Sequence, residues 1–326
     1  MRRTVLLIAL AVLVAAAFAV PLPVVAIVPG PAVSVAPLVR VGAQTTPVHG
    51  KLLLTTVRIS EPPLVEAVAD WLDRKVDVLP REAVIPPGVG EKQYIEAQQQ
   101  VFRESAQVAA AVGLRAAGHL VQILGSGARI SAVIKGSPAD GKLREGDVIV
   151  EVDGRPVRLA SDVVEATGRA RAGDQVTLGI RRGQSQQTIT LQAGKVSQLD
   201  RPGIGVALET VGLDVKLPFP VNVNPEQIGG PSAGLMLALS VYDLVSPADL
   251  AHGRTIAGTG TIDLDGNVGQ VGGVRQKVLA AKAAGATVFL VPTAELADAR
   301  AGAPKGLKLI SVHTFDDALK ALAPAA

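Results

Sequence analysis

The chain contains no cysteine, which excludes disulfide bonds, thiol catalysis and cysteine-ligated metals. Aromatic residues make up only 2% of its 326 residues, too few to provide stacking platforms for nucleic-acid bases. The net charge is +3, the two signs are mixed along the chain, and basic residues cluster only in short pairs such as Arg181-Arg182. Nucleic-acid binding normally requires a concentrated basic face. We therefore predict no nucleic-acid partner.

Histidine is scarce as well, and the four residues are His49, His119, His252 and His313. None of them has a second histidine at the spacing of a zinc-binding helix. We predict that the protein has no metal and no other cofactor.

Charged residues are missing from the apolar run between Thr4 and Val28, which directly follows two arginines. The run is long enough for a bilayer-spanning helix of about 20 residues, although two prolines end the regular helix early. A cleavable signal peptide is the alternative, because Ala17-Phe18-Ala19 resembles a cleavage site. We predict that residues 1–28 form an uncleaved, single-pass signal anchor in the cell membrane. Its basic end then lies in the cytoplasm and the remainder is extracytoplasmic.

A lysine interrupts an otherwise apolar stripe in the segment from Val274 to Ala284, which has the composition and periodicity of a helix. The residues at the spacing of one buried face are Val274, Lys277, Val278 and Ala281. Arg275, Gln276 and Lys282 lie off this stripe and are expected to be solvated. A buried lysine tends toward the neutral amine, which can act as a general base. The alternative is that Lys277 extends its stem along the apolar surface and keeps its charge in water.

A serine stands at the start of another predicted helix, Ser232 to Leu244, directly after Gly229-Gly230-Pro231. Free backbone N–H groups at such a position can stabilise an oxyanion, and a neighbouring neutral amine can activate the hydroxyl. Serine is also a favoured helix N-cap, so a purely structural role is the alternative. The two segments together indicate a Ser-Lys hydrolase.

The stretch from Asn224 to Pro292 resembles the proteolytic domain of the Lon protease family along its whole length. NPEQIGGPSAGLMLAL is similar to the family's nucleophile segment, which implies that Ser232 is the catalytic serine. GTGTIDLDGNVGQVGGVRQKVLAAKAAGATVFLVP is similar to its hairpin, lysine helix and following strand, which implies that Lys277 is the catalytic lysine. The resemblance also implies that Thr259 supports the lysine amine by hydrogen bonding. Gly229 departs from the pattern, because many members carry an acidic residue there.

The middle of the chain, His119 to Gly194, resembles a PDZ domain, and GSPADGKLREGDVIVEVDG is typical of bacterial PDZ modules. Such domains bind an extended peptide as an added strand beside a helix. We expect this helix at Ser161 to Arg169, with Ser161 as its cap. Leu124-Gly125-Ser126-Gly127 is a candidate loop for a peptide carboxylate. It departs from the usual loop signature, so internal and misfolded segments remain open as ligands.

Two other motifs suggest different chemistry. Gly136 to Leu143 nearly spells the nucleotide-binding pattern GxxxxGK[ST], but Leu143 lacks the required hydroxyl and strand-like residues follow. We therefore predict no ATP binding. Gly230 to Gly234 also fits the GxSxG pattern of α/β-hydrolases, with Asp263 or Asp265 and then His313 in that fold's order. The polar, broken sequence before Ser232 disfavours such an esterase.

These observations predict an α/β (α+β) multidomain protein with four segments: a membrane helix at 1–28, an extended stalk and helical lead-in at 29–118, a β-rich PDZ domain at 119–198 and a Lon-type α/β proteolytic domain at 202–326. The PGP motif, the LLLTTV strand and the ESAQVAAAVGLRAAG helix resemble membrane-anchored, PDZ-containing Lon-like bacterial proteases. The predicted function is an ATP-independent serine endopeptidase that cleaves unfolded or PDZ-presented exported or membrane proteins. The resemblance implies a ring-like homo-oligomer, such as a hexamer. An inactive membrane-anchored PDZ adaptor is the alternative from another class.

Overall fold

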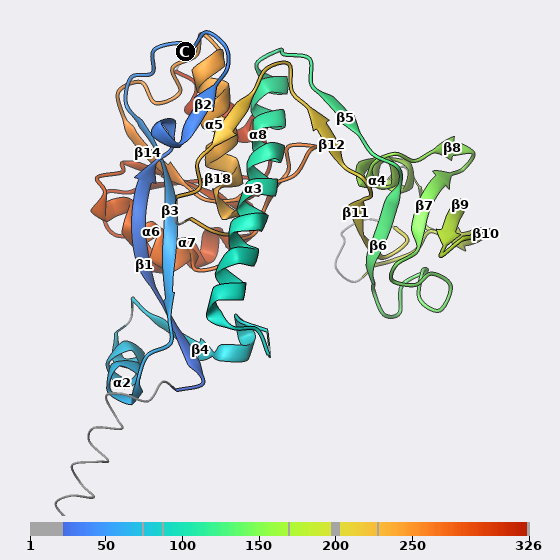
Figure 1. Cartoon of the computed structure of the whole chain (residues 1–326), viewed down its shortest axis with the longest axis horizontal. Coiled ribbons are helices and arrows are strands. Elements are labelled where there is room, and N and C mark those ends of the chain that lie inside the picture. Colours follow the sequence, from blue (N-terminus) through green and yellow to red (C-terminus); the bar gives the residue numbers. More distant parts are fainter. Residues whose placement is uncertain are drawn as a thin grey trace, which may run out of the picture. The chain divides into compact units, whose positions relative to one another are not determined.

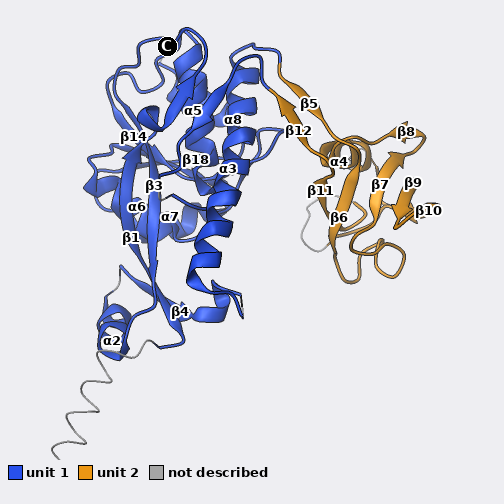
Figure 2. Ribbon diagram, viewed as in Figure 1, with its two compact units in different colours: residues 1–120, 217–326 blue, residues 121–216 orange. Residues whose placement is uncertain are grey.

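The computed structural model describes residues 22–73, 75–86, 88–168, 170–196, 203–226 and 228–324. They form two compact units (Figure 2). Unit 1 combines the described residues up to Leu120 with those from Leu217 onward, and unit 2 comprises Val121–Lys216. The second unit is therefore inserted, in sequence, between two parts of the first.

Unit 1 is built around a six-stranded mixed sheet (Figure 1). Its strands in spatial order are β18 (Lys308–Val312), β17 (Val288–Pro292), β14 (Thr255–Gly258), β3 (Lys51–Ser60), β1 (Val24–Ser34) and β4 (Asp77–Pro80). β14 pairs in parallel with both β3 and β17, and β17 pairs in parallel with β18. β1 is antiparallel to β3 and β4. The sheet thus joins strands from before and after unit 2.

The sequence predicts a separate stalk for residues 29–118, and this is wrong. β1 and β3 are interior strands of the sheet, and β3 pairs directly with β14. The run Leu52-Leu53-Leu54 is buried at every position. A continuous apolar run has no solvent face, so it needs cover on both sides of the strand. The lead-in region is therefore part of the proteolytic unit.

The predicted signal anchor lies mostly outside the described residues, which begin at Leu22. Its predicted end at residue 28 is too late, because β1 begins at Val24 and Val24–Ile27 pair with β4. Within the described ranges, no helix combines the length and the apolar character needed to span a bilayer. The membrane anchor itself stays a prediction.

Helices pack on both faces of the sheet. The helices described in unit 1 are α2 (Leu64–Leu72), α3 (Glu91–Ala116), α5 (Gly234–Val245), α6 (Val274–Ala283), α7 (Leu296–Gly302) and α8 (Phe315–Leu322). α6 and α7 share one apolar core with Leu53, Ala257 and Phe289 of the sheet. The next residue, Gly258, faces the opposite side of the sheet, where a Cβ atom on it would meet Met236 of α5. α3 packs along α5 on that side.

Short strands complete unit 1 around the start of α5. They are β2 (Val39–Val41) with β13 (Val221–Val223), and β15 (Thr261–Ile262) with β16 (Val268–Gly269). The predicted C-terminal strands ATVFLVP and LKLISV and the closing helix are confirmed as β17, β18 and α8.

Unit 2 is a β-rich unit with one helix beside its sheet, α4 (Ala160–Gly168). Its strands are β5 (Gln122–Leu124), β6 (Ala128–Val133), β7 (Val148–Val152), β8 (Arg155–Pro156), β9 (Gln175–Arg182), β10 (Ser185–Gln192), β11 (Val206–Thr210) and β12 (Asp214–Lys216). The main sheet runs β10-β9-β7-β6-β11, and β12 pairs with β5. Since β11 and β12 come from residues that the sequence assigns to the proteolytic domain, the predicted start of that domain at 202 is too early.

The helix of unit 2 is confirmed, but its predicted cap is wrong. α4 begins one residue before Ser161. The Asp162 carboxylate accepts the backbone N–H groups of Arg158 and Leu159 at 2.8 and 2.9 Å. The aspartate therefore stabilises the start of the helix from inside its first turn, a role that the serine was expected to fill from outside.

Candidate active site

Ser232 lies in a short 3-10 turn, Pro231–Ala233, that leads directly into α5. The preceding Gly230 has φ +81°, a left-handed conformation that glycine adopts without strain. Its N–H donates to the Gln98 carbonyl at 2.8 Å, and the Ser105 hydroxyl donates to the Pro231 carbonyl at 3.2 Å. Both partners belong to α3, so this helix holds the serine turn in place.

The same helix explains the glycine at position 229, where the resemblance leads one to expect an acidic residue. A Cβ atom on Gly229 would lie 2.8 Å from the Cβ of Gln98. This approach is closer than two carbon side chains tolerate, so α3 excludes a side chain here. An acidic group near the lysine therefore has to come from another part of the fold.

Lys277 is buried on α6, with only 3% of its surface exposed. The other members of its predicted stripe, Val274, Val278 and Ala281, are buried too, so the stripe is confirmed. Burial lowers the pKa of Lys277 to about 8, and the negative charge of Glu295 opposes this lowering. The lysine therefore does not extend to water, and a part of the population carries a neutral amine near pH 7.

Gln276 was expected to be solvated on α6, and this is wrong, because it is 0% exposed. Its side-chain amide donates to the Lys75 carbonyl at 3.2 Å. α6 packs against β1 and β3 as well as α7, so it has more than one covered face. A single apolar stripe predicts only one of these faces.

Thr259 connects the lysine to the serine segment. The Lys277 Nζ donates to the Thr259 Oγ1 at 3.3 Å, and this hydroxyl donates to the Ser232 carbonyl at 3.1 Å. The predicted support of the lysine amine by this threonine is thus confirmed. The backbone N–H of Gly260 donates to the same Ser232 carbonyl at 3.0 Å. Two donors therefore fix the peptide plane that follows the serine.

Glu295 is a buried carboxylate near this group, and no sequence pattern singled it out. It lies at the end of a 3-10 turn after β17, is 9% exposed, and its Oε2 accepts the Val271 N–H at 2.9 Å. Burial raises its pKa, although the positive charge of Lys277 acts in the opposite direction. Val271 precedes α6, so the glutamate both anchors the entry to the lysine helix and places an acidic group near the amine.

No hydrogen bond in the described residues joins Asp263, His313 and Ser232 into the alternative Ser-Asp-His triad. The Asp263 carboxylate accepts the backbone N–H groups of Asp265 and Asn267 in a turn. His313 is exposed, and its backbone N–H donates to Asp317. Ser232 is not preceded by a strand of the central sheet, because Val221–Val223 pairs only with β2. The GxSxG match therefore lacks the strand-turn-helix context that this chemistry needs.

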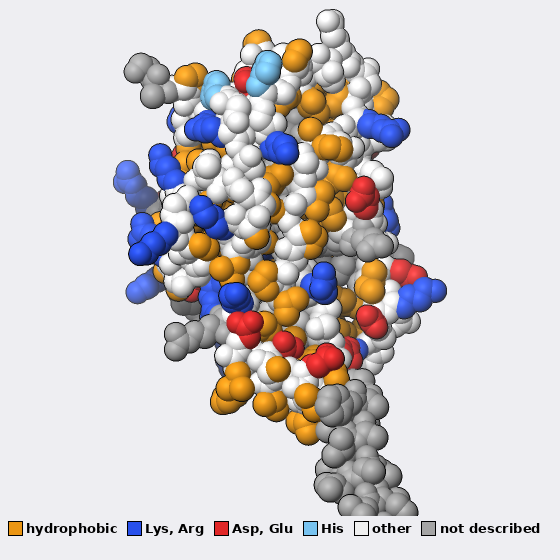
Figure 3. Space-filling model, turned by 90° about the vertical axis from the view of Figure 1, so that its left-hand side faces the viewer, with side chains coloured by type: hydrophobic (Ala, Val, Ile, Leu, Met, Phe, Trp, Pro, Cys, Tyr) orange, Lys and Arg blue, Asp and Glu red, His pale blue; other side chains and the backbone are white. Residues whose placement is uncertain are grey.

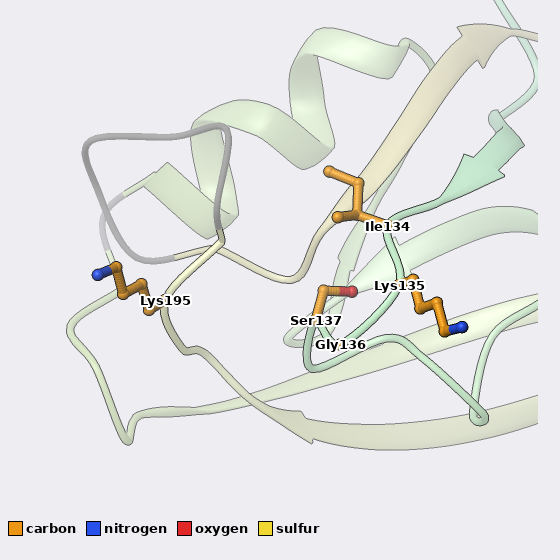
Figure 4. A pocket seen from close by; sticks show the side chains of 5 residues that line it. All are labelled: Ile134, Lys135, Gly136, Ser137 and Lys195. Atoms are coloured by element: carbon orange, nitrogen blue, oxygen red, sulfur yellow. The ribbon is translucent and has the colours of Figure 1, made fainter.

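The segment that resembles a nucleotide-binding loop belongs to unit 2. It runs through turns into strand β7, and no helix begins there. A pocket beside it is lined by Ile134, Lys135, Gly136, Ser137 and Lys195 (Figure 4). The amino groups of the two lysines point away from Ser137 in opposite directions. The arrangement does not converge on a phosphate, and it contains neither Ser232 nor Lys277.

Two amides of the candidate carboxylate-binding loop of unit 2 are engaged internally. The N–H of Ser126 donates to the Val211 carbonyl at 2.8 Å, and that of Gly127 donates to the Arg158 carbonyl at 3.1 Å. A Cβ on Gly125 would lie 2.3 Å from the same Arg158 oxygen. These two amides are therefore not available to a peptide carboxylate.

Comparison with known proteins agrees with the two units. A model of the PDZ domain matches residues 102–193, and a model of the Lon protease (S16) C-terminal proteolytic domain matches residues 208–324. The chain contains a PDZ domain and a Lon-type proteolytic domain. The structural PDZ unit begins later than its match, because residues 102–116 belong to α3. The Lon-type match omits β1 and β3, which complete the sheet of the proteolytic unit.

Relatives of the Lon-type domain include the Lon proteases of Campylobacter concisus, 35% identical over 33% of this chain, and of Rickettsia typhi, 30% identical over 48%. Lon protease 2 of Bacillus subtilis is 33% identical over 34% of this chain. The chain spans only 13%, 20% and 20% of the lengths of these relatives. Among solved structures, the PDZ domain of an SdrC-like protein from Listeria monocytogenes is 24% identical, with a TM-score of 0.24, over 26% of this chain and 87% of that one.

Proposed function

We propose that this protein is an ATP-independent serine endopeptidase in which Ser232 is the nucleophile and Lys277 the general base. The observation that carries the proposal is the buried Lys277 amine, with a pKa of about 8 and a hydrogen bond to Thr259 that leads to the serine turn. A base with a pKa near the working pH is suited to proton transfer. The similarity to Lon proteases supports the same chemistry.

Hydrogen-bond donors define how the amine can act. The Thr259 hydroxyl has one proton, and it is donated to the Ser232 carbonyl, so toward Lys277 the hydroxyl can only accept. A neutral lysine amine keeps its lone pair when it donates one N–H to this oxygen. In the proposed first step, the lone pair accepts the Ser232 hydroxyl proton as the serine oxygen attacks a peptide carbonyl carbon.

Two backbone amides can stabilise the oxyanion that forms in this attack. The Gly234 N–H donates to Pro231 and the Leu235 N–H to Gly260, so these amides are engaged. The backbone N–H groups of Ser232 and Ala233 lie at the start of the 3-10 turn. No carbonyl of the same helix can accept a hydrogen bond from them there. They are the proposed oxyanion donors. The lysine ammonium then gives its proton to the departing amine, and water hydrolyses the acyl-enzyme.

The remaining parts of the function are proposed on sequence grounds. The apolar run before Leu22 tethers the protein to the cell membrane, with both units on the extracytoplasmic side. Polypeptide substrates are unfolded, or are presented by the PDZ domain through strand addition. The catalytic units assemble into a homo-oligomeric ring, as the resemblance to the Lon family implies.

The first test is degradation of an unstructured polypeptide by the purified full chain without nucleotide, beside a Ser232→Ala variant. We expect peptide products from the wild type only, and no increase when ATP is added. Ser232→Ala removes the nucleophile and leaves the turn geometry unchanged. Equal product formation in both samples, or none in either, would reject the protease proposal. The inactive PDZ adaptor would then remain as the alternative.

The pH profile should follow the lysine. Below the Lys277 pKa of about 8, most amines are protonated and cannot accept the serine proton, so activity should fall by about tenfold per pH unit. Glu295→Gln removes a negative charge that favours the ammonium form, so it should lower the pKa of Lys277 further. The rising limb, the pH range in which activity increases, should then shift to lower pH. Single-turnover acylation rates measured against pH give this limb. Asp316→Asn on α8 is the control for loss of a carboxylate, and a Glu295→Gln limb that moved upward would contradict the expectation.

A further inference from the structure

One helix of unit 1 presents large apolar side chains to solvent. The exposed large apolar residues of α2 are Leu64, Val65, Val68, Trp71 and Leu72. Trp71 is the sole tryptophan of the chain and is 76% exposed, and Leu72 is 70% exposed. At the 3.6-residue period, these five positions fall in one continuous arc of the helix. A contiguous apolar surface of this kind marks an interaction site.

The two acids within α2 lie away from this arc. Glu66 and Asp70 are one turn apart and fall on the opposite side of the helix from Val68. The arc itself has no charged residue that could pair with a specific protein partner. Figure 3 shows hydrophobic side chains gathered at the lower end of the face it presents, where α2 lies in Figure 1.

α2 is weakly held by its own unit. It has nine residues, and Ala67 is its one buried residue. Isolated helices of this length are not stable in water, because nucleation costs more than so few hydrogen bonds return. A second surface against the apolar arc would supply the missing burial.

The position of α2 indicates what that surface is. The backbone N–H of Leu22, the first described residue, donates to the Pro62 carbonyl at 3.2 Å. Pro62 lies two residues before Leu64, where α2 begins. Leu22 thus lies beside the start of α2, and the uncharged, apolar stretch from Thr4 to Val20 ends two residues before it in the sequence. A bilayer that holds the upstream segment therefore lies within reach of the arc.

We propose that the apolar arc of α2 rests in the interface of a lipid bilayer and acts as a second membrane contact beside the N-terminal segment. This inference rests on the membrane tether of the proposed function and adds an element to it. A face of tryptophan and aliphatic side chains opposite a charged face suits a helix that lies in the headgroup region. Because the tether keeps α2 close to the membrane, even a short arc binds at a high effective concentration.

The single tryptophan gives a direct test on the full chain. The protein is reconstituted in phosphatidylcholine vesicles whose acyl chains are brominated near the headgroup or near the terminal methyl. We expect Trp71 emission to shift to shorter wavelength and to lose intensity, more with the shallow bromines, since an interfacial helix is buried about 5–10 Å deep. Leu72→Glu should restore emission at longer wavelength and remove the quenching, whereas Glu66→Gln, on the opposite side, should change neither.

Each outcome separates the inference from the function on which it rests. A chain that floats with the vesicles but shows unquenched emission keeps its tether and overturns the α2 contact. Blue-shifted emission without bromine quenching identifies a protein on the arc, such as a second copy, and also overturns it. A chain that does not float rejects both the tether and the contact. Cleavage of a soluble unstructured polypeptide reports the protease separately, and Leu72→Glu should leave it unchanged.

Discussion

Replacing Lys277 with methionine is expected to reduce the rate of peptide-bond cleavage by at least about 10⁴-fold, the loss typical for removal of a nucleophile's base. Methionine has a similar length and suits the buried position better than a charged side chain, so the fold should be retained. The hydroxyl of Ser232 then has no group to accept its proton. Burst-phase measurement of acyl-enzyme formation checks this step directly.

Two control variants sharpen the result. Lys282→Met changes another lysine on α6, whose Nζ donates to the Gly306 carbonyl at 3.2 Å, and should leave cleavage near the wild-type rate. His313→Ala should also leave it unchanged, because this exposed residue is engaged through its backbone at the start of α8. Loss of activity in His313→Ala together with retained activity in Lys277→Met would reverse the assignment.

Replacing Phe102 with alanine is expected to destabilise the proteolytic unit by about 3–5 kcal/mol, the usual cost of removing a buried phenylalanine ring. Phe102 lies on α3 and is fully buried. α3 packs on α5 and on the serine turn, so the loss should reach the strands on which the site is built.

Hydrogen exchange measured segment by segment can distinguish a destabilised unit from a destabilised chain. Amides of β14 and β17 should exchange faster in Phe102→Ala, while those of β9 in the PDZ unit should not change. Val101→Ala, at the neighbouring and partly exposed position, is the matched control. Unchanged protection of β14 and β17 would mean that α3 is a separable stalk after all.

The sequence predicted the centre of the site better than its surroundings. A 3.6-residue stripe is a local property of one helix, and it placed Lys277 on the apolar face, while the choice between a buried amine and one that extends to water was left to the structure. The hydrogen bond from Lys277 to Thr259 followed from the resemblance to the Lon family, since nothing in the spacing of these residues reveals it.

The missed features depend on contacts between distant parts of the chain. Glu295 is a single acid after a strand, and only the fold reveals that its carboxylate accepts the Val271 N–H and that its charge acts on Lys277. The apolar periodicity of α6 predicts a solvated Gln276, because such a pattern does not show that the helix packs against several neighbours. The role of β3 was missed for the same reason, since its partner β14 lies beyond the whole PDZ unit.

That order of segments has a consequence for how the protein is made. Ribosomes release β1 and β3 first, then the whole PDZ unit, and only then β14, β17 and β18. The leucine-rich β3 therefore waits with one edge unpaired, and such an edge can pair with other chains. The PDZ unit, built from neighbouring antiparallel strands, can fold during this interval. Synthesis that stops between Lys216 and Thr255 thus yields a complete PDZ unit attached to an aggregation-prone half of the proteolytic sheet.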